Sequence, residues 1–308
     1  MPDDLQIQID EYNLVEKPAI KLFRSLDYNY IDGHYLDKEP QHFFLQDILK
    51  RKLQELNPWM DEINLNRVFR DITLVQATSA VEANELLYYK LVNYLSVKQD
   101  LGYGKKSQTV KIIDFDNPNK NEFTIVNQFY LKGSDFTIIP DIVVFINGIP
   151  LAVIECKSPN IEEPIDQAIN QLFGYREKVE EFFYPNQVMV ALARYQANYA
   201  STISPAKYFF DWKDPYPLDE NGLKERLNKT ELTKQDILLY SIFNKENVLD
   251  LLRNYIVFER EDNEIHKKLC RYNQYIASRK IIDRIGKGDG GVIWHTQGSG
   301  KSLTMTYT

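Results

Sequence analysis

Two short apolar runs joined by a turn constrain the fold of this chain more than any other feature. Ile142–Ile146 and Leu151–Glu155 flank Asn147-Gly148, a dipeptide typical of tight hairpin turns. Two further runs rich in β-branched and aromatic residues, Val110–Phe115 and Phe123–Tyr130, precede them, with Asn, Pro and Asp in between. Short runs of this kind, separated by turn residues, predict neighbouring strands of one sheet.

Helical patterns surround these strands. Apolar residues recur at helical spacing over Ser79–Tyr94, Glu163–Glu181 and Thr233–Ile256, and Gln187–Ala193 reads as another strand. The sequence therefore predicts an α/β fold in which helices flank a mixed sheet. Charge density rises near Phe258, which places a predicted boundary between a domain over residues 1–258 and a second one that starts within 259–308.

Composition excludes several classes of protein. The 37 Lys and Arg residues against 44 Asp and Glu give a formal charge of −7, so any binding of nucleic acid must rest on local patches. No apolar run approaches the roughly 20 residues of a membrane helix, and no partner in a membrane is expected. The cysteines, Cys156 and Cys270, are isolated in sequence, which argues against disulfides and zinc sites and favours a cytoplasmic protein.

The second strand ends in charged residues that can carry chemistry. Glu155 and Lys157, two apart on a strand, leave the same face, and Asp141 precedes the first strand. Two converging carboxylates bind a hard cation such as Mg²⁺, and a lysine beside them can counter the charge of a phosphate in the transition state. On composition alone, a strand-end ion pair with Asp141 capping a turn explains the same three residues.

The hairpin imposes a geometric condition on this site. With a regular two-residue turn at Asn147-Gly148, Asp141 lies opposite Ile154 and points away from Glu155. A metal site shared by Asp141 and Glu155 therefore predicts a three-residue loop or a bulge that shifts the register by one, and Pro150 is compatible with such an irregularity.

The arrangement of Asp141, Glu155 and Lys157 resembles the signature of the PD-(D/E)xK nuclease superfamily. The resemblance implies a mixed sheet flanked by helices, metal binding by Asp141 and Glu155, and a further ligand in the carbonyl of Cys156. Gln171 and Tyr175 resemble a pair that supports the active site in the RecB-like branch. The sequence does not decide whether Glu16 or Glu82 adds a further carboxylate.

A second motif lies near the end of the chain. The run from His295 to Ser302 follows a predicted strand, Gly291–Trp294, and precedes a predicted helix, which is the context of a phosphate-binding loop. It resembles the looser loop of superfamily-two helicases, in which a glutamine helix upstream reads adenine, and this implies the start of a RecA-like domain that binds ATP. The candidate nucleotide-binding residues are Gln274, Thr296, Gly298, Ser299, Gly300, Lys301 and Ser302.

Both motifs in this order resemble the restriction (R) subunit of type I restriction-modification enzymes. The resemblance implies ATP-driven translocation and Mg²⁺-dependent cleavage of double-stranded DNA in a complex with modification (M) and specificity (S) subunits. The stretch printed here, which has six residues after Ser302, is not expected to hydrolyse ATP by itself. The alternatives are a RecB-like nuclease-helicase without such partners and a non-catalytic interaction domain of a helicase.

Three clusters of basic residues are candidates for contact with DNA, although each is also compatible with an ordinary solvated surface. They are Lys50-Arg51-Lys52, Lys105-Lys106 and Lys267-Lys268 with Arg271.

Overall fold

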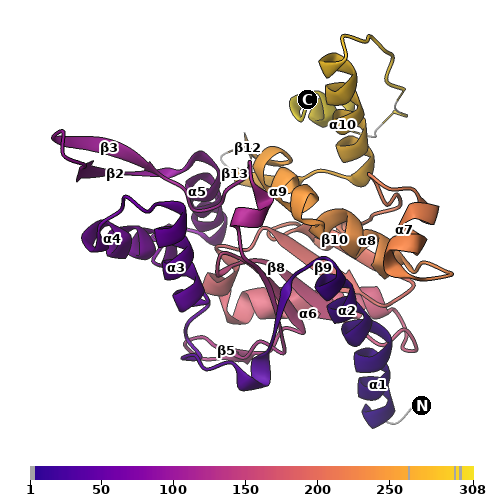
Figure 1. The fold of residues 1–308 in the computed structure, drawn as a ribbon. Helices are drawn as coiled ribbons and strands as arrows, with labels where there is room; N and C mark the ends of the chain where they lie inside the picture. The colour runs from indigo at the N-terminus through magenta and orange to yellow at the C-terminus, as the bar shows by residue number, and fades with distance from the viewer. Residues whose placement is uncertain (1–3, 263, 295, 298–299) are drawn as a thin grey trace.

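A seven-stranded mixed sheet forms the centre of the molecule (Figure 1). The computed structural model describes residues 4–262, 264–294, 296–297 and 300–308. The strand order is β1-β4-β7-β8-β9-β10-β11, and only the β1–β4 and β8–β9 pairs are parallel. These strands are β1 (Asn29–Asp32), β4 (Phe123–Asn127), β7 (Ile142–Ile146), β8 (Ile149–Cys156), β9 (Val188–Leu192), β10 (Ala197–Ser201) and β11 (Phe210–Asp211).

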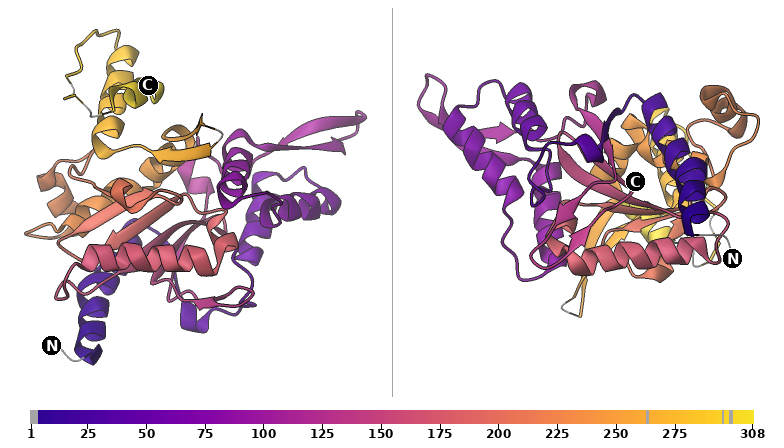
Figure 2. Two further views of the ribbon diagram at one scale, coloured as in Figure 1. Left: turned by 180° about the vertical axis from the view of Figure 1, so that it is seen from behind. Right: turned by 90° about the horizontal axis from the view of Figure 1, so that it is seen from below.

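The middle strands are apolar on both faces because helices cover both sides of the sheet. Every residue of β7, β8 and β9 is buried, which explains why these strands read as continuous Val and Ile runs. One face packs against α6 (Pro164–Lys178), and the other packs against α2 (Lys17–Ser25), α8 (Lys234–Phe243) and α9 (Lys245–Asn254) (Figure 2). The predicted mixed α/β architecture is confirmed.

The parallel pair β8 and β9 is connected through α6. Pro164 opens this helix, where a missing backbone N–H costs nothing, and Ile165, Ala168, Ile169 and Leu172 form its buried stripe. The helix consequently lies along the sheet next to the end of β8. Strand β9 then returns beside β8, with Ala191 opposite Glu155.

The N-terminal part of the chain folds into helices and a separate hairpin. The first helix is interrupted by a π-helical turn, η1 (Tyr12–Glu16), which lies between α1 (Asp4–Glu11) and α2. Next in the chain are α3 (Gln46–Leu56), α4 (Glu62–Thr73), α5 (Ala80–Asn93), β2 (Leu95–Asp100) and β3 (Lys105–Val110). Among the described strands, β2 and β3 pair only with each other. Their hairpin projects from the body of the molecule (Figures 1 and 2).

Short elements complete the chain up to α8. Strands β5 (Leu131–Lys132) and β6 (Thr137–Ile138) pair with each other. The single turns of 3₁₀ helix are η2 (Gly33–Tyr35), η3 (Pro118–Lys120), η4 (Glu180–Phe183) and η5 (Ala206–Tyr208), and α7 (Glu220–Leu227) precedes α8.

The C-terminal part contains a hairpin and two helices. Strand β12 (Ile256–Glu261) pairs with β13 (Glu264–Leu269), and α10 (Tyr272–Gly286) and α11 (Lys301–Thr306) follow. The predicted boundary after Phe258 lies inside β12, and the division into two domains stays a prediction. Among the described residues, no helix combines the length and the apolar character needed to cross a membrane.

The strand predicted at Gly291–Trp294 is not present. These four residues have no regular secondary structure, and Val292 and Trp294 are about nine-tenths exposed. Among the described residues no strand lies alongside this segment to pair with its backbone N–H and C=O groups. An apolar run alone does not make a strand, so the start of a RecA-like domain is not confirmed.

Candidate functional site

A bulge in the β7–β8 hairpin brings the two predicted metal ligands to one face. Ile146 pairs with Ile149 across a two-residue turn, but Val144 pairs with Ala152, so the register shifts by one residue. Leu151 is the extra residue, and it packs on the same side of the sheet as Ala152. Beyond the bulge, Asp141 comes opposite Glu155. The predicted register shift is confirmed.

Asp141 is held from two directions. Its Oδ2 accepts a hydrogen bond from the backbone N–H of Cys156 at 2.7 Å, and its Oδ1 accepts one from Gln128 Nε2 at 3.1 Å. The first bond crosses from β7 to β8 and fixes Asp141 against the end of the neighbouring strand. Gln128 has a φ of +47°, a strained conformation for a residue with a side chain.

Glu155 is completely buried, and one of its oxygens has no protein partner. Lys157 Nζ donates to Glu155 Oε1 at 2.7 Å, while Glu155 Oε2 accepts no hydrogen bond. An unpaired buried carboxylate oxygen is costly, so its retention points to a ligand that the chain itself does not supply. Lys157 Nζ also donates to the carbonyl of Cys156 at 2.8 Å and lies 3.6 Å from Glu11 Oε2.

The thiol of Cys156 is not part of this cluster. Its side chain packs into the apolar core on the opposite face of the sheet from Glu155, and burial raises the pKa of the thiol well above its usual value. Only the backbone of Cys156 lies at the site, with its N–H bonded to Asp141 and its carbonyl bonded to Lys157. A metal ligand at Cys156 is therefore restricted to the carbonyl oxygen.

The π-helical turn adds two carboxylates from the N-terminus. Lys17 N–H donates to Tyr12 O, a five-residue step that lets Glu11 and Glu16 reach the same cluster. Glu16 accepts hydrogen bonds from Asn127 Nδ2 at 3.0 Å and from Gln128 Nε2 at 3.1 Å, so Gln128 bridges Glu16 and Asp141.

The structure separates the two carboxylates between which the sequence did not decide. Glu82 accepts hydrogen bonds from the backbone and the side chain of Thr78 just before α5. Glu16 contacts Gln128, which also contacts Asp141. Of the two, Glu16 is the one that joins the site.

The two predicted polar residues of α6 support the site from the side. Gln171 Nε2 donates to Tyr175 Oη at 2.5 Å, and Tyr175 Oη donates to the carbonyl of Ile139 at 3.0 Å, which fixes the strand entry just ahead of Asp141. Burial and the Glu155 carboxylate raise the pKa of Tyr175. Gln167, one turn earlier, donates to Glu162 O and does not take part in this bonding.

Burial makes this cluster electrostatically unfavourable for its carboxylates. Burial and the neighbouring Asp141 raise the pKa of Glu155 well above its usual value, and burial raises the pKa of Asp141 and of Glu11. Burial also raises the pKa of Glu16 to about 7. Burial lowers the pKa of Lys157, but Glu155 and Asp141 outweigh it and raise the pKa overall. The carboxyl groups of Glu11, Asp141 and Glu155 near one ammonium would gain from a further cation.

The arrangement fits a metal held by few side chains. Among the described residues, no group of three or more His, Cys, Asp and Glu side chains is placed around one point as metal ligands. Asp141, the unpaired oxygen of Glu155 and the carbonyl of Cys156 are all oxygen donors, which suit Mg²⁺, and Mg²⁺ keeps several waters in such sites.

The second predicted site lies where the starts of α10 and α11 meet. Gln274, which is buried, donates from Nε2 to Gly300 O at 3.1 Å and accepts from the backbone N–H of Arg271 at 2.8 Å. Gly300 has a φ of +80°, and a Cβ there would collide with Gln274. Helix α11 begins directly afterwards with Lys301 and Ser302, whereas Gly298 and Ser299 lie outside the described residues. Thr296 is described and exposed.

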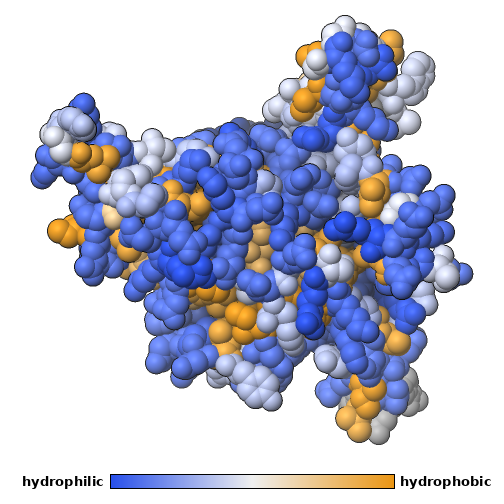
Figure 3. Space-filling model, viewed as in Figure 1, coloured by the Kyte–Doolittle hydropathy of each residue, from blue (hydrophilic) through white to orange (hydrophobic). Residues whose placement is uncertain are grey.

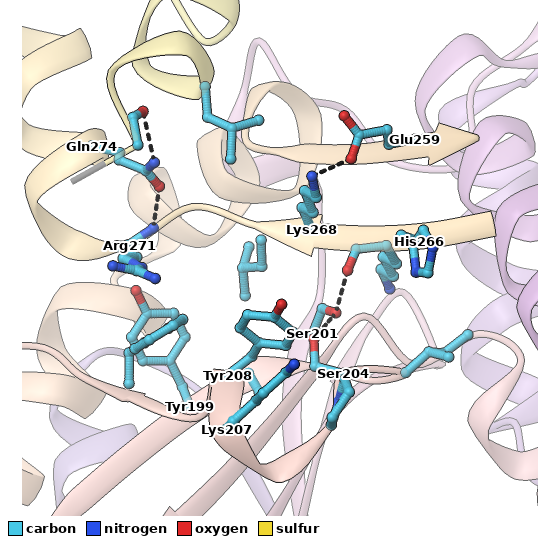
Figure 4. Close-up of a pocket in the computed structure, with 18 of the residues that line it drawn as sticks. Tyr199, Ser201, Ser204, Lys207, Tyr208, Glu259, His266, Lys268, Arg271 and Gln274 are labelled. Atoms are coloured by element: carbon cyan, nitrogen blue, oxygen red, sulfur yellow. Dashed lines mark hydrogen bonds and ion pairs between the residues drawn. The ribbon is translucent and has the colours of Figure 1, made fainter. Parts of the chain in front are cut away.

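A cavity of about 460 Å³ adjoins Gln274 and Gly300 (Figure 4). Its walls come from the β10–β11 connection, from the β12–β13 hairpin and from the start of α10. Lys207, Tyr208 and Arg271 line it, and the Arg271 guanidinium stacks over the Phe210 ring at 4.1 Å. Sequence reasoning did not single out Lys207, Tyr208 or Phe210, because no motif links residues so far from the loop.

The predicted basic patch at Lys267, Lys268 and Arg271 is not a surface patch. Lys267 is buried, and its Nζ donates to Gln187 Oε1 at 2.6 Å and to Gln187 O at 3.3 Å. Burial lowers its pKa well below the usual value. Lys268 is ion-paired with Glu259. Alternation along β13 turns Lys267 into the core, so the three basic residues do not form one exposed cluster.

Two segments of the chain match known protein families. Residues 8–208, more than half of the chain, match the family described as Type I restriction enzyme R protein N terminus. The chain belongs to this family. Residues 273–308, which include Gln274 and α11, match the SWI2/SNF2 ATPase family.

Individual relatives of this chain are named as endonuclease subunits of type I restriction enzymes. The chain is 29% identical to a putative type I restriction enzyme MjaIXP endonuclease subunit of Methanocaldococcus jannaschii, over 97% of this chain and 31% of the relative. It is 30% identical to the type I restriction enzyme HindI endonuclease subunit of Haemophilus influenzae, over 96% of this chain and 29% of the relative. The chain thus spans about a third of the length of these curated relatives.

Three residues at the carboxylate site were not predicted from the sequence. They are Glu11, Asn127 and Gln128. Glu11 and Glu16 are five residues apart, and an unbroken α-helix would point them in different directions, so only the π turn reveals the pair. Asn127 and Gln128 end a strand ahead of the motif, and no sequence signal marks them.

Proposed function

We propose that the carboxylate site is a Mg²⁺-dependent nuclease centre that hydrolyses phosphodiester bonds of double-stranded DNA. The observation that carries the proposal is the unpaired, fully buried Oε2 of Glu155, on a strand that a bulge has brought opposite Asp141. Two relatives are named endonuclease subunits of type I restriction enzymes, which supports the same activity for this chain.

Each residue of the site would have a distinct role. Asp141, Glu155 and the Cys156 carbonyl would hold the metal, which supplies a Lewis acid and lowers the pKa of bound water when it is present. Lys157 would orient the attacking water or counter the charge that develops on the phosphate. It is already poised for this, because the pKa of its ammonium is raised by Glu155 and Asp141 and it stays charged.

The remaining residues would position these groups. Gln171 supports Tyr175, and Tyr175 ties α6 to the carbonyl of Ile139, two residues before Asp141. Gln128 donates to both Glu16 and Asp141 and would hold these two buried acids next to each other. Glu16 would act through the side-chain amide of Gln128, which it shares with Asp141. Its carboxylate would make the binding of a cation at the site more favourable.

A nucleotide site would serve the motor that this activity requires. Gln274, Gly300, Lys301 and Ser302, with Thr296, Gly298 and Ser299 of the same loop, would bind ATP next to the cavity that Arg271 lines. The match of residues 273–308 to an ATPase family supports this assignment. In a complex with modification and specificity subunits, ATP hydrolysis would drive translocation of DNA before cleavage.

Metal binding tests the nuclease site without requiring activity. Titration of the 308-residue chain with Mn²⁺, followed by electron paramagnetic resonance of the free ion, should reveal a site whose affinity falls about tenfold or more in Glu155→Gln. Glu82→Gln makes the same chemical change at a glutamate that contacts Thr78. This variant should bind Mn²⁺ as the wild type does. Soaked crystals should show anomalous density between Asp141 and Glu155. Equal affinity in Glu155→Gln and wild type would overturn the assignment.

A further inference from the structure

The β2–β3 hairpin is a polar arm that the nuclease site does not use. Strands β2 and β3 form a sheet of two strands that stands out from the rest of the molecule, and the same projection is evident in the space-filling view (Figures 1 and 3). Residues 95–110 contain three lysines and one aspartate, whereas the whole chain has a formal charge of −7. The arm is therefore basic on an acidic protein.

One face of the arm presents hydrogen-bond donors in cross-strand pairs. Ser96 lies opposite Thr109 and Lys98 opposite Ser107, and all four side chains are exposed. Lys105 lies on this face as well, and Lys106 is exposed on the other. Within the described part of the chain, none of the three lysines has an ion-pair partner. Lysine, serine and threonine are among the side chains that contact phosphate oxygens of DNA.

The opposite face fixes the arm to the body at its base. Val97 is buried, and Gln99 accepts hydrogen bonds at its Oε1 from the backbone of Asp61 at 3.1 Å and from Asn64 at 3.0 Å. Gln99 Nε2 donates to Trp59 O. Because Gln99 is tied to the chain around the start of α4, the arm holds its direction rather than swinging freely.

The tip of the arm is also preformed. Asp100 Oδ1 accepts hydrogen bonds from the backbone N–H groups of Gly102 at 2.8 Å and Gly104 at 3.0 Å, and both glycines have positive φ values. This turn displays Tyr103, whose side chain is 86% exposed, with Leu101 beside it. A large aromatic ring held out at the end of a basic ribbon pays little entropy on binding.

We propose that the β2–β3 hairpin is a duplex-DNA contact arm, with the phosphate backbone bound by Lys98, Lys105 and Lys106 and Tyr103 seated in a groove. The inference deepens the proposed nuclease function and rests on DNA being its substrate. A two-stranded ribbon has the width of a DNA groove, and phosphate contacts of this kind carry no sequence preference. The arm thus holds DNA of any sequence near the chain.

The salt dependence of DNA binding tests this proposal. Fluorescence anisotropy of a labelled duplex of about 30 base pairs, titrated with the 308-residue chain in EDTA, gives affinity over a range of salt concentrations. The variant with Lys98→Ala, Lys105→Ala and Lys106→Ala should bind on the order of tenfold more weakly at low salt. Its salt slope should be smaller by roughly 2.7, about 0.9 for each lost phosphate contact.

A matched control separates this arm from general charge. Lys120, Lys178 and Lys234 are exposed lysines on other elements, and their triple alanine variant changes the net charge by the same amount. This control should retain the wild-type salt slope. Tyr103→Ala should weaken binding while the salt slope stays the same, since it removes a contact without a charge.

Three results would overturn the proposal. These are equal losses in the two triple variants, an unchanged slope in the hairpin variant, or no measurable binding by the wild-type chain at low salt. A hairpin variant that loses capture of a protein partner but keeps DNA affinity also counts against it. EDTA removes divalent metal from this assay, so its outcome is independent of Mn²⁺ binding at Asp141 and Glu155, and the two proposals fail separately.

Discussion

Strand β8 and the segment at residues 291–294 have similar sequences and opposite structures. Both are short apolar runs followed by polar residues that carry the predicted chemistry. Every residue of β8 is buried between β7 and β9, whereas Val292 is 91% exposed. The difference shows that an apolar run becomes a strand only where neighbouring backbones satisfy its hydrogen bonds. A site at the end of β8 therefore inherits a fixed geometry from the two strands beside it.

The largest expected effect separates the two sites by their chemistry. In the complete endonuclease subunit with its partners, Lys157→Ala should slow DNA cleavage by about 10²–10³-fold or more, because the ammonium beside Glu155 is lost. ATP hydrolysis should be retained. Lys301→Ala should abolish ATP hydrolysis, and with it the cleavage that depends on translocation, while Mn²⁺ binding at Asp141 persists. Cleavage assays, ATPase assays and Mn²⁺ titration of the same preparations measure these effects.

Lys157→Arg serves as the control for this prediction. It keeps the positive charge next to Glu155. Circular dichroism of both Lys157→Ala and Lys157→Arg should match that of the wild type, which would show that a loss of cleavage in Lys157→Ala is not a loss of structure. Wild-type cleavage by Lys157→Ala would show that Lys157 has no part in the reaction.

The next prediction concerns packing in the two runs. Ile154→Ala, at a fully buried position of β8, should lower the free energy of unfolding by about 2–5 kcal/mol. Val292→Ala should change it by less than about 0.5 kcal/mol. Urea denaturation of both variants measures the contrast. Comparable losses would mean that residues 291–294 are packed as β8 is, and the contrast between the two runs would be wrong.

A smaller effect should appear as a dependence of stability on pH. The pKa of Glu16 is raised from 4.5 to about 7, so folding favours its protonated form. The free energy of unfolding is then highest below the unfolded-state pKa and decreases as pH rises through about 7. Glu16→Gln should remove this decrease, which amounts to at most about 3 kcal/mol. Denaturation in EDTA between about pH 4.5 and pH 8 measures it.

Glu82→Gln provides the matching control for the pH series. The pKa of Glu82 is lowered by the Thr78 side chain and backbone, so this variant should not remove a loss of stability at neutral pH. If Glu16→Gln retains the wild-type pH profile, Glu16 is not held in a buried and unfavourable environment.

Sequence was sufficient for the parts of the site that share one hairpin. Asp141, Glu155 and Lys157 lie within 17 residues, and the requirement that the two carboxylates face each other predicts the shift that Leu151 provides. That Gln171 and Tyr175 share one face of α6 follows from helical spacing, whereas their role at the site came from the resemblance to the RecB-like branch. Each of these inferences depends on a local period, two for strands and about 3.6 for helices, and local periods are visible in sequence.

The parts that could not be predicted depend on contacts between distant segments. Gln128 reaches Glu16, which lies 112 positions away, and no local pattern encodes that contact. Lys267 reads as part of a basic patch, yet the alternation of β13 directs it to Gln187, 80 residues earlier. The residues at 291–294 have the composition of a strand, but within the described part of the chain no strand lies beside them to pair with. Pairing partners, rather than composition, decide all three.

The π-helical turn places one residue more in the N-terminal helix than a regular α-helical turn would contain. Because η1 takes five residues for a step that an α-helix makes in four, loss of one residue between Glu11 and Glu16 would leave a carboxylate pair at a spacing of four, still on one face. Loss of one residue from Lys17–Ser25, which is a regular α-helix, would have a different effect. It would rotate both carboxylates by about 100° around the helix and carry them away from Asp141.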